Sequence, residues 1–345
     1  MTLAIRSLQY SQLAAASAQS AIRPLLAAVV SVAAFALLPV QAAAQDAKAY
    51  PARVVRVIIG YPPAGAVDIM GRMMAARLSE ALGQQFIVEN RPGASQNIAA
   101  ELVARATPDG YTLLHTSSAL GINASLYPKL NYHPIKSFAP VAVFSQAPNL
   151  LVTHPSLPVN TVRDFIALAK KNPGKLNFAA PVGTTQHLSG ELLQLLTGVK
   201  MTHIPYKGSA PALTALISGE VDFAFNNITS AHPLLQQNRL KALAVTSRNR
   251  SPVLPNVATM IESGVKDFEV AAWYGYLAPA GTPPAVVTKL NATMQSIAGT
   301  SEFRQQLARL GADAIVESPQ FFSGFLEQEI VRWQVAVKAS GAKPD

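Results

Sequence analysis

The sequence predicts an α/β protein whose two lobes close on a ligand cleft like a clamshell. Short apolar stretches alternate with amphipathic ones along most of the chain, which is typical of strands and helices that build parallel sheets. The order strand, Gly- or Pro-bearing loop, helix occurs in two separate stretches. The second stretch interrupts the first, with crossings near Gln146 and Val270, and this arrangement is typical of hinged binding proteins.

The composition is that of a globular protein and excludes several kinds of function. The chain has 345 residues, of which 50% are apolar and 14% charged, enough for a large core and two domains. Its formal net charge of +9 comes from scattered residues without a basic run, so nucleic acid is not an expected partner. The absence of cysteine excludes disulfides, thiolate nucleophiles, Cys-ligated zinc and a lipidated N-terminal cysteine.

Residues 1–44 are predicted to form an export signal peptide. Two arginines precede an apolar run from Leu25 to Val40, and a group of alanines follows that ends at Ala44. The apolar run is shorter than the roughly 20 residues that a membrane-spanning helix needs. We therefore expect cleavage near Ala44 and a mature chain that begins at Gln45, outside the inner membrane. The alternative is a membrane anchor that is never cut.

The stretch from Val54 to Gly83 is the predicted centre of the ligand site. It begins with a β-branched strand up to Ile59, continues through a loop that includes Gly65, and becomes an amphipathic helix from about Val67. Backbone N–H groups at the start of such a helix can bind an anion. No Gly-x-Gly-x-x-Gly or Gly-Lys-Ser/Thr is present, so a small carboxylate is a better candidate than a nucleotide phosphate. The alternative is an ordinary connection between a strand and a helix.

The first lobe is completed by further strands and helices in alternation. They are expected at Phe86–Asn90 (strand), Asn97–Ala106 (helix) and Tyr111–His115 (strand). Because parallel strands carry their loops at the carboxyl ends, the loop after Ile59 and the segment Thr116–Asn123 should share one rim. Ser117, Ser118 and Asn123 offer neutral hydrogen-bond donors there.

The second lobe is expected to repeat this plan after a boundary near Gln146. Strands at Val141–Phe144 and Asn149–Thr153 flank the boundary. The elements that follow are a helix at Val162–Lys171, a strand, loop and helix over 175–196, a strand at Met201–Ile204, a helix from Ser209, and strands at Val221–Phe225 and Leu240–Thr246. A strand at Val270–Leu277 then returns to the first lobe, followed by helices at Pro284–Ala298, Ser301–Leu310 and Pro319–Ala339. The predicted lobes are therefore residues 45–147 with 270–345, and residues 148–269.

Six motifs, in order along the mature chain, resemble the Bug family of periplasmic receptors for tripartite tricarboxylate transporters. They are Tyr61-Pro-Pro-Ala-Gly-Ala-Val-Asp68, Val88-Glu-Asn-Arg-Pro-Gly-Ala94, Pro108-Asp-Gly-Tyr-Thr-Leu113, Pro205-Tyr-Lys-Gly-Ser-Ala-Pro211, Ala242-Leu-Ala-Val-Thr-Ser247 and Ala278-Pro-Ala-Gly-Thr-Pro283. The resemblance implies a type II-like periplasmic binding protein. It also implies a small organic carboxylate as ligand, held by loop main chain, hydroxyl groups and bridging waters.

The resemblance also nominates ligand-binding residues. Carried over by position, they are Tyr61, Ala64, Gly65, Asp68, Ser117, Ser118, Asn123, Thr184, Thr185, His187, Tyr206 and Asn226. Trp273 and Tyr274, on the strand that returns to the first lobe, are expected as walls of the cleft.

The chain departs from the family pattern at three places. Ala64-Gly65 stands where two glycines are usual, which should narrow that loop by one methyl group. Ser118-Ala119 replaces the usual Ser-Gly, and Asn226 replaces the usual acid. The loss of that acid favours a plain carboxylate over an amino acid as the ligand.

Three of the nominated residues keep a second interpretation. Asp68 orients a ligand amine or hydroxyl, or else only complements the helix dipole. His187 contacts the ligand or is a packed residue. Tyr206 closes over the ligand or packs beside the hinge.

The expected function is transport of a small mono- or dicarboxylate to membrane permease subunits, by a monomer that uses no cofactor and no metal. The first alternative is a ligand-sensing receptor subunit for a membrane signalling partner. An enzyme is less favoured, because the six histidines are scattered and neither His-Glu-x-x-His nor Gly-x-Ser-x-Gly occurs.

Overall fold

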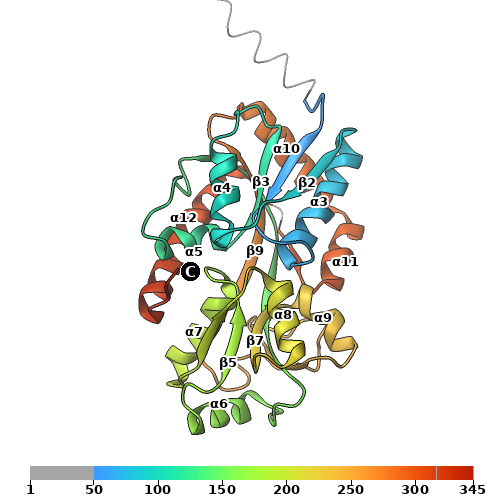
Figure 1. The fold of residues 1–345 in the computed structure, drawn as a ribbon. Coiled ribbons are helices and arrows are strands. Elements are labelled where there is room, and N and C mark those ends of the chain that lie inside the picture. The colour runs from blue at the N-terminus through green and yellow to red at the C-terminus, as the bar shows by residue number, and fades with distance from the viewer. Residues whose placement is uncertain (1–49, 316, 345) are drawn as a thin grey trace, which may run out of the picture. The chain divides into compact units, whose positions relative to one another are not determined.

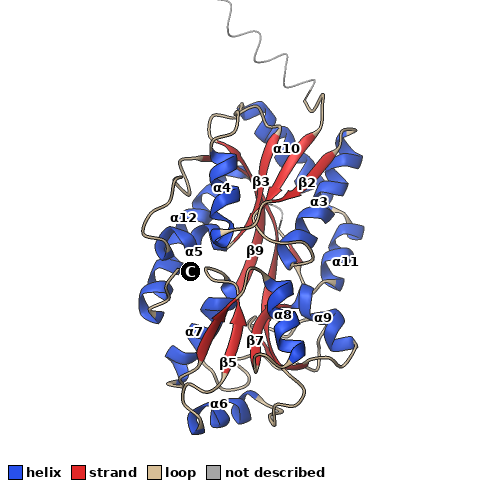
Figure 2. Ribbon diagram, viewed as in Figure 1, coloured by secondary structure: helices blue, strands red, loops and turns tan. Residues whose placement is uncertain are grey.

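The computed structural model describes residues 50–315 and 317–344, and from Pro51 onward the chain packs as one compact unit. Strands and helices alternate along it (Figures 1 and 2). The chain begins with β1 (Val55–Ile59), α3 (Ala66–Leu82), β2 (Phe86–Asn90), the short 3₁₀ helix η1 (Ala94–Gln96), α4 (Asn97–Ala104), β3 (Thr112–Ser117) and α5 (Ala119–Leu126). The predicted signal peptide, residues 1–44, lies outside the described residues.

The middle and the end of the chain follow the same α/β plan. After β4 (Phe138–Thr153) come α6 (Val162–Lys171), β5 (Asn177–Ala180), α7 (Thr185–Thr197), β6 (Thr202–Pro205), α8 (Ser209–Ser218), β7 (Phe223–Asn227), α9 (Ile228–Gln236) and β8 (Lys241–Val245). The chain closes with β9 (Ala271–Pro279), α10 (Pro284–Gly299), α11 (Ser301–Arg309), β10 (Asp313–Ala314) and α12 (Pro319–Ser340). Among the described residues, none of the helices combines the length and apolar character that a membrane span requires.

Local sequence sets many of the helix ends. Thr184 caps the start of α7 by accepting a bond from the His187 backbone N–H, and Thr161 forms a capping box with Asp164 at the start of α6. Gly83 and Gly198 end α3 and α7 in the left-handed conformation, with φ of 68° and 71°, which glycine adopts without a Cβ clash.

One sheet with the strand order β2-β1-β3-β9-β4-β7-β5-β6 runs through the molecule. The strands β1, β2 and β3 pair in parallel, as do β5, β6 and β7, whereas β4 and β9 run antiparallel to their neighbours. We call β1, β2, β3 and β9 with their helices the first lobe, and β5 to β8 with α6 to α9 the second lobe (Figure 1). The predicted two-lobed α/β fold is confirmed.

Strand β4 joins the two lobes. Its residues Phe138 to Pro148 pair with β9, and its residues Asn149 to Thr153 pair with β7 and β8. The two separate strands predicted on either side of Gln146 are therefore one continuous strand. Gln146 and Pro148 do not break it, because both retain a partner on β9.

Two helices, α5 and α9, were not predicted from the sequence. The predicted rim segment Thr116–Asn123 is not a loop, because α5 begins at Ala119 directly after β3. Helix α9 follows β7 without a connecting loop and includes Pro233. An internal proline is a poor helix signal in sequence, and here it lies near the end of a short helix.

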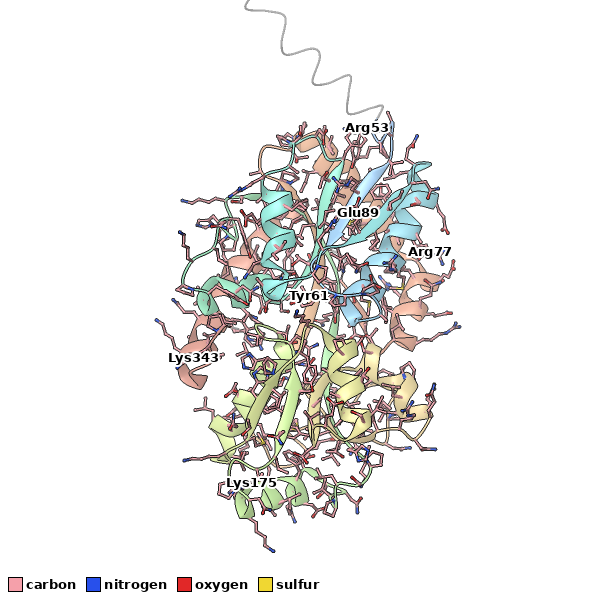
Figure 3. All side chains as sticks on the ribbon, in the orientation of Figure 1. Arg53, Tyr61, Arg77, Glu89, Lys175 and Lys343 are labelled. Atoms are coloured by element: carbon pink, nitrogen blue, oxygen red, sulfur yellow. The ribbon has the colours of Figure 1, made fainter. Side chains whose placement is uncertain are left out.

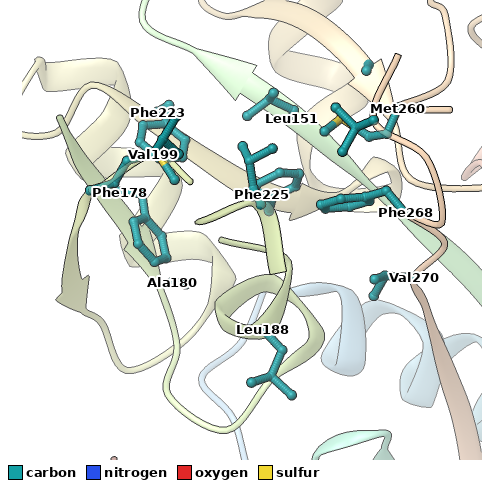
Figure 4. Close-up of a cluster of buried hydrophobic side chains, with 14 of the residues drawn as sticks. Leu151, Phe178, Ala180, Leu188, Val199, Phe223, Phe225, Met260, Phe268 and Val270 are labelled. Atoms are coloured by element: carbon teal, nitrogen blue, oxygen red, sulfur yellow. The ribbon is translucent and has the colours of Figure 1, made fainter. Parts of the chain in front are cut away.

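Each lobe has its own apolar core. In the second lobe, Phe178, Phe223, Phe225 and Phe268 are fully buried, and the rings of Phe178 and Phe223 stack at 5.4 Å between centroids (Figure 4). In the first lobe, Ile58, Leu114 and Leu277 belong to a separate cluster. Helix α12 contributes to both, through Phe322 to the first cluster and through Trp333 to the second.

A buried carboxylate fastens α12 to β9. Glu329 is 4% exposed and accepts bonds from the indole nitrogens of Trp273 at 3.0 Å and Trp333 at 2.8 Å. Arg332 also donates to Glu329, at 3.3 Å. Because the chain has only 2 tryptophans, both indoles depend on this one side chain for their hydrogen bonds.

We expect Glu329→Ala to lower the free energy of unfolding by about 2–4 kcal/mol, because two buried indole N–H groups lose their acceptor. Urea unfolding followed by tryptophan fluorescence measures this, and the emission of both tryptophans should shift to the red. Glu327→Ala, an exposed position on the same helix, is the matched control and should change little. An unchanged unfolding midpoint for Glu329→Ala would contradict the assignment.

Candidate ligand site

A cavity lies where loops of the two lobes meet, with Tyr61 at the junction (Figure 3). The space between atoms within it, counting its open mouth, is about 460 Å³. The first lobe and β9 contribute Tyr61, Pro62, Gly65, Ala66, Val67, Ser117, Ser118, Ala119, Ala272 and Tyr274 to its lining. The second lobe contributes Pro181, Thr184, Thr185, Gln186, Gly208, Ser209, Ala210, Pro211 and Asn227.

Four helices begin at this cavity. The first residues of α3 and α5 line it from the first lobe, and those of α7 and α8 line it from the second lobe. The first N–H groups of a helix have no partner within the helix, and the helix dipole makes this end positive. The cavity therefore attracts negative charge from both sides.

The lining combines hydroxyl and amide side chains with small apolar ones, and it carries no charged side chain among the described residues. None of the described residues that line the cavity is Asp, Glu, Lys or Arg. Ser118 Oγ accepts a bond from the Trp273 backbone N–H at 3.0 Å, and its own hydrogen has no acceptor among the bonds of the described residues. Within residues 50–315 and 317–344, no three His, Asp or Glu side chains gather in a way that could hold a metal ion.

The structure brings seven of the nominated residues to this cavity. They are Tyr61, Gly65, Ser117, Ser118, Thr184, Thr185 and Tyr274. The loop after β1 and the start of α7, which come from different lobes, thus face one space, as the sequence led us to expect. Seven other nominated residues do not line it: Ala64, Asp68, Asn123, His187, Tyr206, Asn226 and Trp273.

Strand alternation explains two of these differences. Successive side chains of a strand point to opposite faces. On β9, Tyr274 lines the cavity, whereas the Trp273 indole turns the other way to Glu329. At the end of β7, Asn227 lines the cavity, whereas Asn226 is buried beside the start of α8, with its Nδ2 3.5 Å from the Ser209 carbonyl.

Asp68 supports the loop after β1 from behind. Its carboxylate accepts bonds from the Ala64 backbone N–H at 3.1 Å, the Arg72 guanidinium at 3.0 Å and the Asn90 amide at 2.8 Å. Asn90 also donates to the Tyr61 carbonyl at 2.9 Å. Burial alone would raise the pKa of Asp68, but the bonds from Arg72, Asn90 and Ala64 outweigh it and lower the pKa.

Ala64 does not line the cavity, so the methyl group expected to narrow the loop leaves the cavity itself unchanged. The Ala64 side chain is exposed, and its φ of 67° places it in the left-handed region that favours glycine. The methyl group therefore adds backbone strain on the outer side of the loop. Ala119, by contrast, is buried and lines the cavity, so the second departure from the family pattern does place a methyl group on the wall.

His187 and Asn123 are buried and do not line the cavity. The His187 ring stacks on His203 at 4.1 Å between centroids, and burial, followed by the charge of His203, lowers the pKa of His187 to about 3. Asn123 donates through Nδ2 to the Ser95 carbonyl at 2.7 Å. Ser95 Oγ in turn donates to the Val182 carbonyl at 2.6 Å, which links η1 to the loop after β5.

Tyr206 lies outside the cavity as well. It is half-buried and packs against the cluster of apolar residues between α8 and β8. This position agrees with the packing interpretation, in which the ring does not cover the ligand.

The sequence placed Gln186 in the nominated loop Gly183–His187 and Asn227 on a polar rim with Asn226, but singled out neither, and it did not nominate Ser209. The rule that loops follow the carboxyl ends of parallel strands, applied to β5, β6 and β7, would have found all three. Ser209 is the first residue of α8, directly after Gly208, and Asn227 is the last residue of β7.

Two α/β lobes around a cavity lined by hydroxyl, amide and small apolar side chains define a solute-binding protein, and the comparisons agree. Residues 70–342 match the tripartite tricarboxylate transporter family receptor, and the chain belongs to this family. It is a receptor and not an enzyme, and the resemblance to the Bug family is confirmed.

Individual relatives and solved structures are also similar to this chain in sequence and fold. Protein BugT of Bordetella pertussis is 36% identical over 305 residues, which cover 88% of this chain and 94% of BugT. The structure of R. palustris Rpa4515 with adipate has a TM-score of 0.84 and 39% identity, covering 86% of this chain and all (100%) of that chain. MatC (Rpa3494) from Rhodopseudomonas palustris with bound malate has a TM-score of 0.78 and 36% identity, covering 84% and 100%.

We expect Asp68→Asn to lower the free energy of unfolding at pH 7 by about 1–3 kcal/mol, because the charged acceptor of three bonds is lost. The folded pKa of Asp68 lies below its unfolded value of about 3.9, so this stabilisation is present above about pH 4 and is lost as the pH falls through the folded pKa. In urea unfolding, the difference in free energy of unfolding between the wild type and Asp68→Asn should shrink as the pH falls from 7 to 2.5. Asp313→Asn, an exposed position, is the control; a gap that stays constant with pH would contradict this role for Asp68.

Proposed function

We propose that the chain captures a small organic mono- or dicarboxylate in the cavity between its lobes and delivers it to the membrane permease subunits of a tripartite transporter. The observation that carries this proposal is the meeting of four helix starts with uncharged hydroxyl and amide groups at one cavity. Adipate and malate, held by two relatives of the same fold, belong to this ligand class.

The available interactions are strong enough for useful affinity. Micromolar binding needs about 8 kcal/mol. A hydrogen bond to a charged group contributes roughly 1.5–3 kcal/mol and a helix start roughly 0.3–1 kcal/mol. Three or four donors with two helix starts and some apolar burial reach this sum without an arginine or lysine in the cavity.

The lobe boundaries support closure about β4 and β9. We place the first lobe at residues 45–147 with 270–345 and the second at 148–269. Strand β4 changes partner from β9 to β7 between Pro148 and Asn149, which is where a hinge can bend without breaking either half-sheet. The closed form is what a permease would recognise, with the receptor acting as a monomer.

Binding is tested with a panel of succinate, malate, glutarate and adipate, against hexanediamine, glucose and the neutral amide adipamide. We expect at least one acid to bind with a micromolar dissociation constant in calorimetry. At 100 times that constant it should stabilise the fold by about 2.7 kcal/mol. Stabilisation by the amine, amide or sugar, with none by the acids, would overturn the ligand class.

We expect export to place the receptor in the periplasm, the compartment named for the similar structure of periplasmic binding protein BugD. We expect the mature protein to begin at Gln45, because the predicted signal ends at Ala44. Intact mass measurement of protein from the periplasmic fraction tests this. A mass that retains residues 1–44 would show an uncleaved anchor instead.

A further inference from the structure

A chain of five buried polar side chains runs from the second-lobe wall of the cavity into the second lobe. Gln186, Ser209 and Asn227 line the cavity, and Asn149 and Ser189 lie deeper. All five are at most 9% exposed. We call these residues the polar relay.

The hydrogen bonds of the polar relay run in one direction. Ser189 Oγ donates to the Thr185 carbonyl at 2.7 Å, so the Ser189 oxygen is left as an acceptor. Asn149 Nδ2 donates to this oxygen at 3.1 Å, and Asn227 Nδ2 donates to Asn149 Oδ1 at 2.9 Å. A backbone carbonyl cannot exchange donor for acceptor, so Thr185 fixes the orientation of both amides.

The same direction continues to the cavity wall. Gln186 Nε2 donates to Asn227 Oδ1 at 2.6 Å and to Ser209 Oγ at 3.1 Å, which uses both of its hydrogens. Ser209 therefore receives a bond on its oxygen, and its own hydrogen has no acceptor among the bonds of the described residues. A β-carbon placed on Gly65 would be 3.9 Å from Ser209 Cβ, so Ser209 lies directly beside the first-lobe loop where the two lobes meet.

We propose that Ser209 donates its hydroxyl hydrogen to an anionic oxygen of the ligand, and that Asn149 is a positioning residue that acts through Asn227 and Gln186. This inference rests on the proposed function. If the hydrogen bonds of the relay had the opposite direction, Gln186 would present its side-chain oxygen to Ser209. The Ser209 hydroxyl would then donate its hydrogen to Gln186 and could not donate it to the ligand. The relay thus makes this wall selective for hydrogen-bond acceptors.

The first test is Ser209→Ala, measured by calorimetry with the acid of the panel of succinate, malate, glutarate and adipate that binds the wild type most tightly. Loss of one hydrogen bond to a charged group should weaken binding by about tenfold or more. Ser218→Ala, at the other end of α8, is the matched control and should bind as the wild type does.

The second test is Asn149→Ala, which changes no residue of the cavity lining. We expect binding to weaken by roughly threefold to tenfold, because the amides of Asn227 and Gln186 can then turn and occupy the Ser209 hydroxyl. In the double variant with Ser209→Ala, Asn149→Ala should not weaken binding further, because the Ser209 hydroxyl on which it acts is already absent. Thr153→Val, a buried position on the same strand, controls for general loss of packing.

The outcomes are distinguishable. If no acid binds the wild type, the proposed function fails and the Ser209 assignment with it. If Ser209→Ala binds the acid as tightly as the wild type, only the Ser209 assignment fails. If the effects of Asn149→Ala and Ser209→Ala simply add, Asn149 acts on the fold and the relay is overturned. Should Asn149→Ala not fold, Ser189→Ala removes the same anchor with a smaller change and replaces it in the cycle.

Discussion

Strand β4 is hydrogen-bonded to both lobes. This shared pairing fixes the position of the two half-sheets relative to each other, and so the place where the loops that line the cavity meet. Its first part pairs with β9 and its second part with β7 and β8. Because one strand sets the register of both half-sheets, the carboxyl ends of β1 and β3 open towards the carboxyl ends of β5, β6 and β7. The cavity is a consequence of that opposition. Helix α12, fastened to β9 through Glu329, adds a second element that reaches both cores.

Recognition of an anion without a cationic side chain follows from this geometry. A lysine or arginine in the cavity would attract an anion, but it would also need desolvation and would reorganise when the ligand leaves. Helix starts carry fixed partial charge, and their N–H groups are held by the helix itself. A receptor that must release its ligand to a permease gains from donors that are moderate in strength and fixed in place.

Buried polar groups in the second lobe are also held in a fixed orientation, in their case by hydrogen bonds to one another. Burying an unpaired amide or hydroxyl group in a core costs free energy. The polar relay avoids this cost, because each amide hydrogen that faces another relay member has an acceptor. The direction of the bonds, set at the Thr185 carbonyl, determines which atoms face the ligand. Asp68 has the same kind of role in the first lobe, because it holds the loop through Ala64 and Asn90 without lining the cavity.

The amino-acid sequence by itself determined the two-lobed α/β plan, the family, most strand and helix positions and the rim segments at Tyr61, Ser117 and Thr184. These are local properties: hydrophobic period, glycine and proline at turns, and caps at helix starts. Only the tertiary structure decided which side chains on those rims face the cavity. Tyr274 lines it and Trp273 does not, and Asn227 lines it where Asn226 was expected, because a shift of one residue on a strand reverses the face. The continuity of β4 across Gln146 and the burial of His187 against His203 likewise depend on partners distant in sequence, which local pattern does not reveal.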